Sequence, residues 1–210
     1  MRSPSSILMC IMSAMIMVVA PTVTTVGQDR GDALVDPRRE WFSLAANKGK
    51  EFEVNDPESV PSLLALEVER ADCRFRDVIR ERPIRFISYE GRRFAIVFCR
   101  SGILGSDRLF DLTNLRRPRA IEFPIVHHPQ GFETTSEPGA ITWDRNTGVL
   151  QAESQSDMCP TPGLRHIYRL SSHSLNFVLV RLEVQQPGCR EGEWISIWDS
   201  PRWSLPEKTK

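Results

Sequence analysis

The sequence lacks an excess of charge of either sign, because its 210 residues carry 27 Lys and Arg against 27 Asp and Glu. A formal net charge of zero excludes a bulk nucleic-acid binder, which needs a strongly basic surface. The sequence also lacks glycine-rich phosphate loops, dinucleotide-binding fingerprints and paired catalytic carboxylates. We therefore expect no cofactor and no nucleic-acid partner.

Metal-binding spacings are missing as well, since the chain holds no Cys-x-x-Cys and no His-x-x-x-His. His127 and His128 are adjacent, and adjacent side chains on an extended segment point to opposite faces. Only Glu133 and Glu137 lie nearby in the sequence as further ligands. We interpret this segment as a polar loop and predict no metal site.

A nucleophile held beside a base does not appear among the motifs. The chain has no Gly-x-Ser-x-Gly, and neither Ser101 nor Ser156 is tied by its spacing to His166 or to another histidine. We interpret these serines as turn residues, and Asp144 and Asp157 as turn acids. The sequence therefore favours a protein without a catalytic site.

The longest uncharged run lies at the N-terminus, where Arg2 precedes the apolar segment 7–20. Small residues follow at 25–27, at the spacing that a signal peptidase requires. We expect residues 1–27 to be a cleaved signal peptide, and the mature protein to be periplasmic or secreted without stable membrane insertion. An anchor in the inner membrane is the alternative, because 7–26 is uncharged over about 20 residues, the length that spans a bilayer.

Four of the five cysteines follow this segment, and an even set in an exported chain is typical of disulfides. We predict that Cys73 pairs with Cys99 and that Cys159 pairs with Cys189, because each pair closes a modest loop within one local hairpin unit. Under the loop-entropy relation, each bridge stabilises the fold by roughly 3 to 4 kcal/mol.

Helix signals precede the strands. Asp36 can cap a short helix that starts at Pro37 and ends before Gly49. The charged, proline-bounded segment 50–61 is interpreted as a linker. A second helix over 62–70 begins at Ser62 as its cap, although the same residues would also make a strand.

From residue 84 onward, short apolar runs alternate with turn residues, which is typical of antiparallel hairpins. The segment 119–126 is interrupted by Pro124, and 127–139 is interpreted as a long polar loop. We predict a mainly β protein of eight or nine strands in a sandwich, barrel or propeller-like sheet, with one or two short N-terminal helices. The expected organisation is a helix and linker at 28–60, a disulfide-stapled β-domain at 61–204 and a tail at 205–210.

Several motifs recur in one family. They are DC at Cys73, FAIVFC followed by RSGILG, LFDL, the FP dipeptide, the ITWD and TGVL hairpin, SQSDMC and GCREGEWISIW. With these motifs, the C-terminal two-thirds, from about 72 to 203, resembles the bacterial periplasmic family catalogued as domain of unknown function 1176. The loop before the third cysteine is glycine-rich in that family, whereas SQSDMC has no glycine. The resemblance implies an exported β-rich fold with two disulfides and brings no catalytic residue.

Arginine and tryptophan residues mark the candidate binding surface. Twelve arginines lie between Arg74 and Arg119, where they either keep outward strand faces soluble or form a basic face for an anionic partner. Trp194 and Trp198 are four residues apart and are expected on one face of a strand, as core residues or as a ligand platform. The candidate binding residues are Arg92, Arg93, Arg116, Arg117, Trp143, Trp194 and Trp198. We expect an exported, non-catalytic protein that binds an envelope protein or glycan, and an envelope hydrolase with a nonstandard active site is the alternative.

Overall fold

The protein is described by a computed structural model, which covers residues 37–45, 51–101, 104–127, 131–154, 163–171, 176–185 and 193–201. These residues all belong to one unit, 35–210. They form two five-stranded sheets, a separate two-stranded hairpin and two short α-helices. The predicted mainly β fold is confirmed in its sandwich form, and the described residues hold twelve strands rather than eight or nine.

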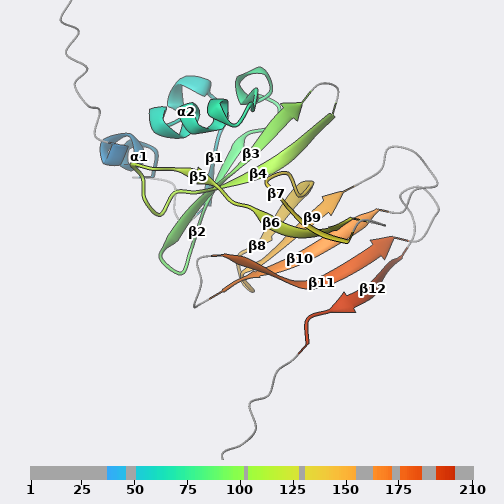
Figure 1. Ribbon diagram of the computed structural model, residues 1–210. Helices are drawn as coiled ribbons and strands as arrows, with labels where there is room; N and C mark the ends of the chain where they lie inside the picture. The colour runs from blue at the N-terminus through green and yellow to red at the C-terminus, as the bar shows by residue number, and fades with distance from the viewer. Residues whose placement is uncertain are drawn as a thin grey trace, which may run out of the picture. The chain divides into compact units, whose positions relative to one another are not determined.

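The first sheet is a meander in which each strand pairs antiparallel with its neighbour in the sequence. Figure 1 shows these strands in colours that run from teal at β1 through green to yellow-green at β5. Their bounds are β1 Glu51–Val54, β2 Ile84–Tyr89, β3 Arg92–Ser101, β4 Leu104–Asp111 and β5 Arg119–Ala120. Glu90 and Gly91 both have positive φ between β2 and β3, as a two-residue hairpin turn requires.

Both faces of this sheet are buried. Along β3, Phe94 and Ile96 belong to the core that lies between the two sheets, whereas Ala95 and Val97 belong to the core beneath the helices. Successive strand residues point to opposite faces. The uninterrupted apolar run FAIVF therefore arises because both neighbouring layers are apolar, and not from a helical segment.

Helices cover one face of the first sheet. Their bounds are α1 Pro37–Ala45, α2 Ser62–Arg70 and the 3₁₀ helices Pro57–Ser59 and Phe75–Asp77. Leu64 and Val68 of α2 are buried in the core that this layer shares with the sheet. A disulfide joins Cys73, just after α2, to Cys99 of β3. The first of the two predicted bridges is thus confirmed.

The second sheet is also a meander, with the order β12-β11-β10-β9-β8. Its bounds are β8 Ala140–Asp144, β9 Val149–Ser154, β10 Leu164–Leu170, β11 Phe177–Gln185 and β12 Trp194–Asp199. Hairpins join β8 to β9 and β10 to β11, in keeping with the antiparallel hairpins predicted from residue 84 onward. Leu150 and Tyr168 are fully buried on the inner face, in one core with Phe94 and Leu109 of the first sheet.

A hairpin of β6 Phe123–His127 and β7 Gly131–Thr135 packs on the inner face of the second sheet. The Tyr168 hydroxyl donates to the Pro124 carbonyl at 3.0 Å, and the Val126 N–H donates to Nε2 of His166 at 3.0 Å. The Phe123 ring lies 5.0 Å from the Tyr168 ring. These contacts fix the hairpin against β10.

The two sheets are also joined by polar contacts at one place. Asp107 of β4 forms an isolated antiparallel bridge with Gly139, and its carboxylate accepts from the Ile141 N–H at 2.7 Å. The Arg85 guanidinium donates to the Ile141 carbonyl. The start of β8 is therefore anchored to β2 and β4 through backbone as well as side-chain groups.

Three local predictions are wrong. The supposed linker 50–61 contains β1, which pairs with β2 and is an edge of the first sheet. The supposed polar loop 127–139 contains β7, which forms through its antiparallel pairing with β6 although its three central residues are exposed. Ser62 does not cap α2, because Pro61 occupies the cap position and no side-chain cap hydrogen bond is formed there. The Ser62 N–H instead donates to Glu40 of α1 at 2.8 Å.

Several predictions lie outside the described residues: the signal peptide at 1–27, the Cys159–Cys189 bridge, the tail at 205–210, and the residues His128, Ser156 and Asp157. Within the described ranges, no helix is both long enough and apolar enough to cross a membrane.

Candidate functional site

The four candidate arginines are dispersed. Arg92 and Arg93 are consecutive on β3, and their side chains leave the sheet on opposite faces. The Arg92 guanidinium lies 5.9 Å from the Phe94 ring in the inter-sheet layer, whereas that of Arg93 lies 5.6 Å from the Trp41 ring on the helical side. Arg116 and Arg117 are exposed on the turn before β5. These residues do not form one basic face.

The three candidate tryptophans are separated as well. A register shift in the β11–β12 pairing places Ser196 opposite Glu183 but Trp198 opposite Leu182, so Ile197 is an extra residue. The expectation that Trp194 and Trp198 share a face is therefore wrong. Trp198 packs against the inter-sheet core, and the Trp194 ring lies 4.0 Å from the Arg165 guanidinium on the outer face.

Trp143 occupies a third position. Its half-buried ring lies on the inner face of β8, at 5.2 Å from the Tyr89 ring and 6.4 Å from the Phe177 ring. Tyr89 itself is positioned by Gly148, where a Cβ would overlap the tyrosine ring. The tryptophan is thus a contact between the turn ends of the two sheets.

A groove of about 670 Å³ lies where β5, the β6–β7 hairpin, the start of β11 and β12 meet. Its size is in the range of small-ligand and side-chain pockets. The buried residues Ile121, Phe177 and Leu179 form its floor. Trp198 lines one part of it, so one of the seven candidate residues belongs to this groove.

Exposed apolar side chains line the same groove. Phe132 of β7 is 70% exposed and Val178 of β11 is 45% exposed, although both border the buried floor. Phe132 follows Gly131 and is held in place by the β6–β7 pairing, in which it lies opposite Val126. A large apolar side chain that a fold holds in water beside an apolar groove is available to bury against a partner.

The rim of the groove is polar. Arg119 borders it, with an ion pair of 3.3 Å to the buried Asp111 that leaves 59% of the arginine side chain exposed. Asp111 also accepts from the Thr113 N–H at 2.9 Å, which fixes the carboxylate. Glu122 and Asn176 add exposed polar groups to the rim. An apolar floor within a polar rim is the usual composition of a protein-binding patch.

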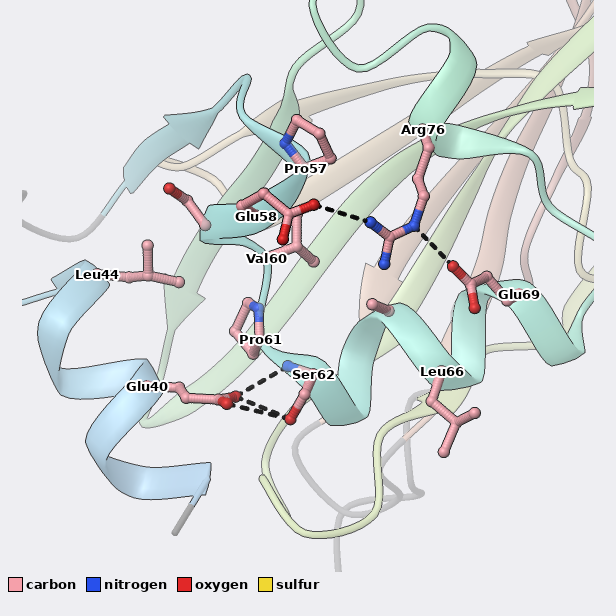
Figure 2. A pocket seen from close by; sticks show the side chains of 12 residues that line it. Glu40, Leu44, Pro57, Glu58, Val60, Pro61, Ser62, Leu66, Glu69 and Arg76 are labelled. Carbon is pink, nitrogen blue, oxygen red and sulfur yellow. Dashed lines mark hydrogen bonds and ion pairs between the residues drawn. The ribbon is translucent and has the colours of Figure 1, made fainter. Parts of the chain in front are cut away.

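A second hollow of about 710 Å³ lies among α1, the 3₁₀ helix Pro57–Ser59 and α2. Figure 2 shows Arg76 reaching between two carboxylates, with ion pairs of 3.5 Å to Glu58 and 2.8 Å to Glu69. The hydrogen bond to Glu69 raises the pKa of Arg76 above its ordinary value. Glu40 points at Ser62 and occupies the start of α2. These charged groups already bind one another, so the hollow is a junction of the helical layer.

Two of the groups considered for catalysis, His166 and Asp144, lie in the described part of the chain and are bound to their own surroundings. His166 is buried, and because its Nε2 accepts a backbone N–H, that nitrogen carries no proton of its own. Asp144 caps the β8–β9 turn, where hydrogen bonds from Thr147 and Asn146 lower the pKa of its carboxyl. In the part of the chain that the structure describes, no three or more His, Cys, Asp or Glu side chains are grouped as metal ligands.

The function must therefore be inferred from the groove itself. No protein-family model, curated protein or solved structure matches the chain. The sequence prediction missed Phe132 because a single aromatic residue within GFETT gives little signal of a strand. Trp198 was found because tryptophan is rare and large, but its partners in the groove come from four separate elements.

Proposed function

We propose that this protein is an exported, non-catalytic binding protein whose groove holds an apolar stretch of a partner protein in the bacterial envelope. The observation that supports this proposal is the 70% exposure of Phe132 beside an apolar groove of about 670 Å³. Export and the relationship to the family of domain of unknown function 1176 are parts of the same proposal.

The energetics suit a modest, reversible contact. Burying a Phe side chain that stood in water contributes about 1.5–3 kcal/mol, which is about tenfold or more in affinity. Val178 adds a smaller apolar area on the opposite side of the groove. A few apolar anchors of this kind, within a polar rim, account for most of the affinity in protein interfaces.

The lining favours a peptide over a glycan. The floor and walls contain Ile121, Val178 and Leu179, which are aliphatic and offer no hydrogen bonds to sugar hydroxyls. Trp198 is the one tryptophan in the groove, and it packs against the core rather than standing free as a platform. An apolar side chain of a protein partner matches these walls, because it needs no polar group from them.

The proposal is tested with ¹⁵N-labelled protein and a capped seven-residue peptide whose Leu-Phe-Leu centre is flanked by Gly and Ser. We expect saturable amide shifts in β7, β11 and β12, and none with a peptide in which Ser replaces the three apolar residues. Phe132→Ser should weaken the peptide affinity at least tenfold. Phe42→Ser is the matched control, because Phe42 of α1 is 62% exposed but lies outside the groove.

Two results would contradict the proposal. One is the absence of saturable shifts at millimolar peptide. The other is an affinity that Phe132→Ser leaves unchanged while Phe42→Ser lowers it. Circular dichroism of each variant shows whether the fold is intact before the affinities are compared.

A further inference from the structure

A ring of five side chains closes one end of the inter-sheet layer. Arg92 lies directly opposite Tyr89 across the β2–β3 hairpin, and its guanidinium lies over the Phe94 ring. The Phe94 and Phe177 rings are 5.7 Å apart, the Phe177 and Trp143 rings 6.4 Å, and the Trp143 and Tyr89 rings 5.2 Å. Each of the five residues is thus next to two others, and Tyr89 is again paired with Arg92. We call these five residues the arginine cage.

The two terminal nitrogens of the guanidinium in this cage have no acceptor among the described residues. Arg92 is 8% exposed, and neither Nη1 nor Nη2 has a hydrogen-bond partner anywhere in the described ranges. Arg92 also takes part in none of the ion pairs among the described residues. A buried charge without a partner costs several kcal/mol, so buried guanidinium groups in proteins are paired with an anion or with hydrogen-bond acceptors. The cage departs from this rule.

A second buried polar group without a hydrogen-bond partner lies in the same cage. Nε1 of Trp143 is buried without a hydrogen-bond partner among the residues that the structure places. Indole Nε1 only donates, and a guanidinium has five N–H groups and no acceptor. Every unsatisfied atom of the cage is therefore a donor. What would satisfy all of them is an acceptor, and the charge of Arg92 selects a negative one.

The backbone around the cage fixes its place in the fold. Gly148 has a φ of +65°, and a Cβ at this position would overlap the Tyr89 ring. Glu90 and Gly91, which directly precede Arg92, form the turn at the end of the hairpin, and Glu90 is exposed. Arg92 thus lies two residues from an exposed turn residue, which makes the cage an end of the inter-sheet layer rather than its centre.

We propose that the arginine cage binds the carboxylate group of a small organic acid, with the two Nη groups of Arg92 donating to its oxygens. A guanidinium presents two parallel N–H groups that match the two oxygens of a carboxylate, and such bidentate pairs are stronger than neutral hydrogen bonds. The flat aromatic walls suit a planar group. The cage shares Phe177 with the floor of the groove, but its donors Arg92 and Trp143 do not line the groove. Carboxylate binding by the cage therefore does not depend on the function proposed for the groove.

The test uses NMR of ¹⁵N-labelled protein titrated with sodium formate and sodium acetate, against sodium chloride at equal ionic strength. We expect saturable shifts of the Trp143 indole N–H and of the Arg92 guanidinium signals with the carboxylates, and none with chloride. The thermal midpoint should rise with the same concentration dependence, because a ligand that binds only the folded state stabilises it.

Arg92→Met should abolish the saturable shifts, since Met keeps the apolar stem and removes all donors. Arg93→Met is the matched control, because Arg93 is the next residue of β3 but lies on the helical side. Trp143→Phe keeps an aromatic ring and should weaken carboxylate binding about fivefold, with the Arg92 guanidinium signals as the readout. This variant keeps the test open if Arg92→Met does not fold.

The proposal is overturned if 100 mM formate and acetate give no saturable shift, or if Arg92→Met binds them as the wild type does. It is also overturned if sodium sulfate saturates the site and the two carboxylates do not. Peptide binding is followed by the amide shifts of β7, β11 and β12, whereas carboxylate binding is followed by the side-chain signals of Arg92 and Trp143. A failure to bind one ligand can therefore be distinguished from a failure to bind the other.

Discussion

Asp107 is the residue whose substitution tests the junction between the two sheets most directly. Its side chain is 6% exposed, and one carboxylate oxygen accepts from the Ile141 N–H at 2.7 Å. The other oxygen lies 3.8 Å from the Arg82 guanidinium. We compare Asp107→Ala, which removes the acceptor, with Asp107→Asn, which keeps an oxygen for Ile141 and removes the charge.

The two substitutions separate the hydrogen bond from the charge. Leaving a buried N–H without an acceptor costs about 1–3 kcal/mol, so Asp107→Ala should lower the free energy of unfolding by at least that amount at pH 7. Asp107→Asn should lower it by less than about 1 kcal/mol, because its amide oxygen can still accept from Ile141. The loss of charge also removes a desolvation penalty.

The pH dependence follows from that penalty. Burial, the largest influence, raises the pKa of Asp107, although the Ile141 N–H and the nearby arginines lower it in part. An acid whose pKa is higher in the folded state than in the unfolded chain, where it is about 3.9, binds more protons when folded. The free energy of unfolding of the wild type should therefore fall, relative to Asp107→Asn, as the pH rises above about 4 through the folded pKa.

Urea unfolding followed by circular dichroism at pH 4 and pH 7 measures both effects. When the pH is lowered from 7 to 4, the free energy of unfolding of the wild type should increase relative to that of Asp107→Asn. Equal losses for the Ala and Asn variants at pH 7 would show that the Ile141 hydrogen bond contributes nothing. A wild-type advantage that grows with rising pH would refute the direction of the pKa shift.

Two further substitutions test the covalent and backbone constraints. Replacing Cys73 and Cys99 by Ala opens a bridge between residues 26 apart, which should cost about 3.5 kcal/mol by the loop-entropy relation. Adding a reductant to wild-type protein should lower the free energy of unfolding by at least this amount in urea unfolding, because it also opens the predicted Cys159–Cys189 bridge. Gly139→Ala should lower the thermal midpoint more than Gly131→Ala does. Both glycines have positive φ, which costs about 1–2 kcal/mol with Ala, but at Gly139 a Cβ would also overlap the backbone of β9. Equal midpoints for the two variants would contradict this.

Much of the strand pattern could be predicted from the sequence because it depends on neighbours in the chain. The ITWD and TGVL motifs were expected to form a hairpin, and they do so as β8 and β9, with Gly148 at positive φ in the turn. The helix over Ser62–Arg70 was placed with the observed bounds, and Cys73 was paired with Cys99. These features are local, so the residues that determine them lie close together in the sequence.

Features that depend on distant partners were not predicted. β1 was taken for a linker because its charged residues conceal the apolar side that packs beneath the helices. Trp194 and Trp198 were placed on one face because spacing cannot reveal the extra Ile197 in the β11–β12 pairing. Arg92 was expected on a surface, but its face of β3 is covered by the second sheet.

The candidate groove could not be predicted for the same reason. Its lining comes from β5, the β6–β7 hairpin, β11 and β12, and only the packing of the hairpin on β10 brings them together. Trp198 was named from residue type alone. Phe132 gains its significance from exposure beside a buried floor, which is a property of the fold and not of the residue.

The order of strands in the two meanders has a consequence for how the chain folds. Every strand of the first sheet pairs with a neighbour in the sequence, so this sheet can fold from local hairpins before the second sheet has been synthesised. Until β8 to β12 arrive, however, Phe94, Ile96 and Leu109 on its far face have no cover. The half-finished protein is thus a sheet with a bare apolar face, which is most prone to aggregate in the interval between completion of the two meanders.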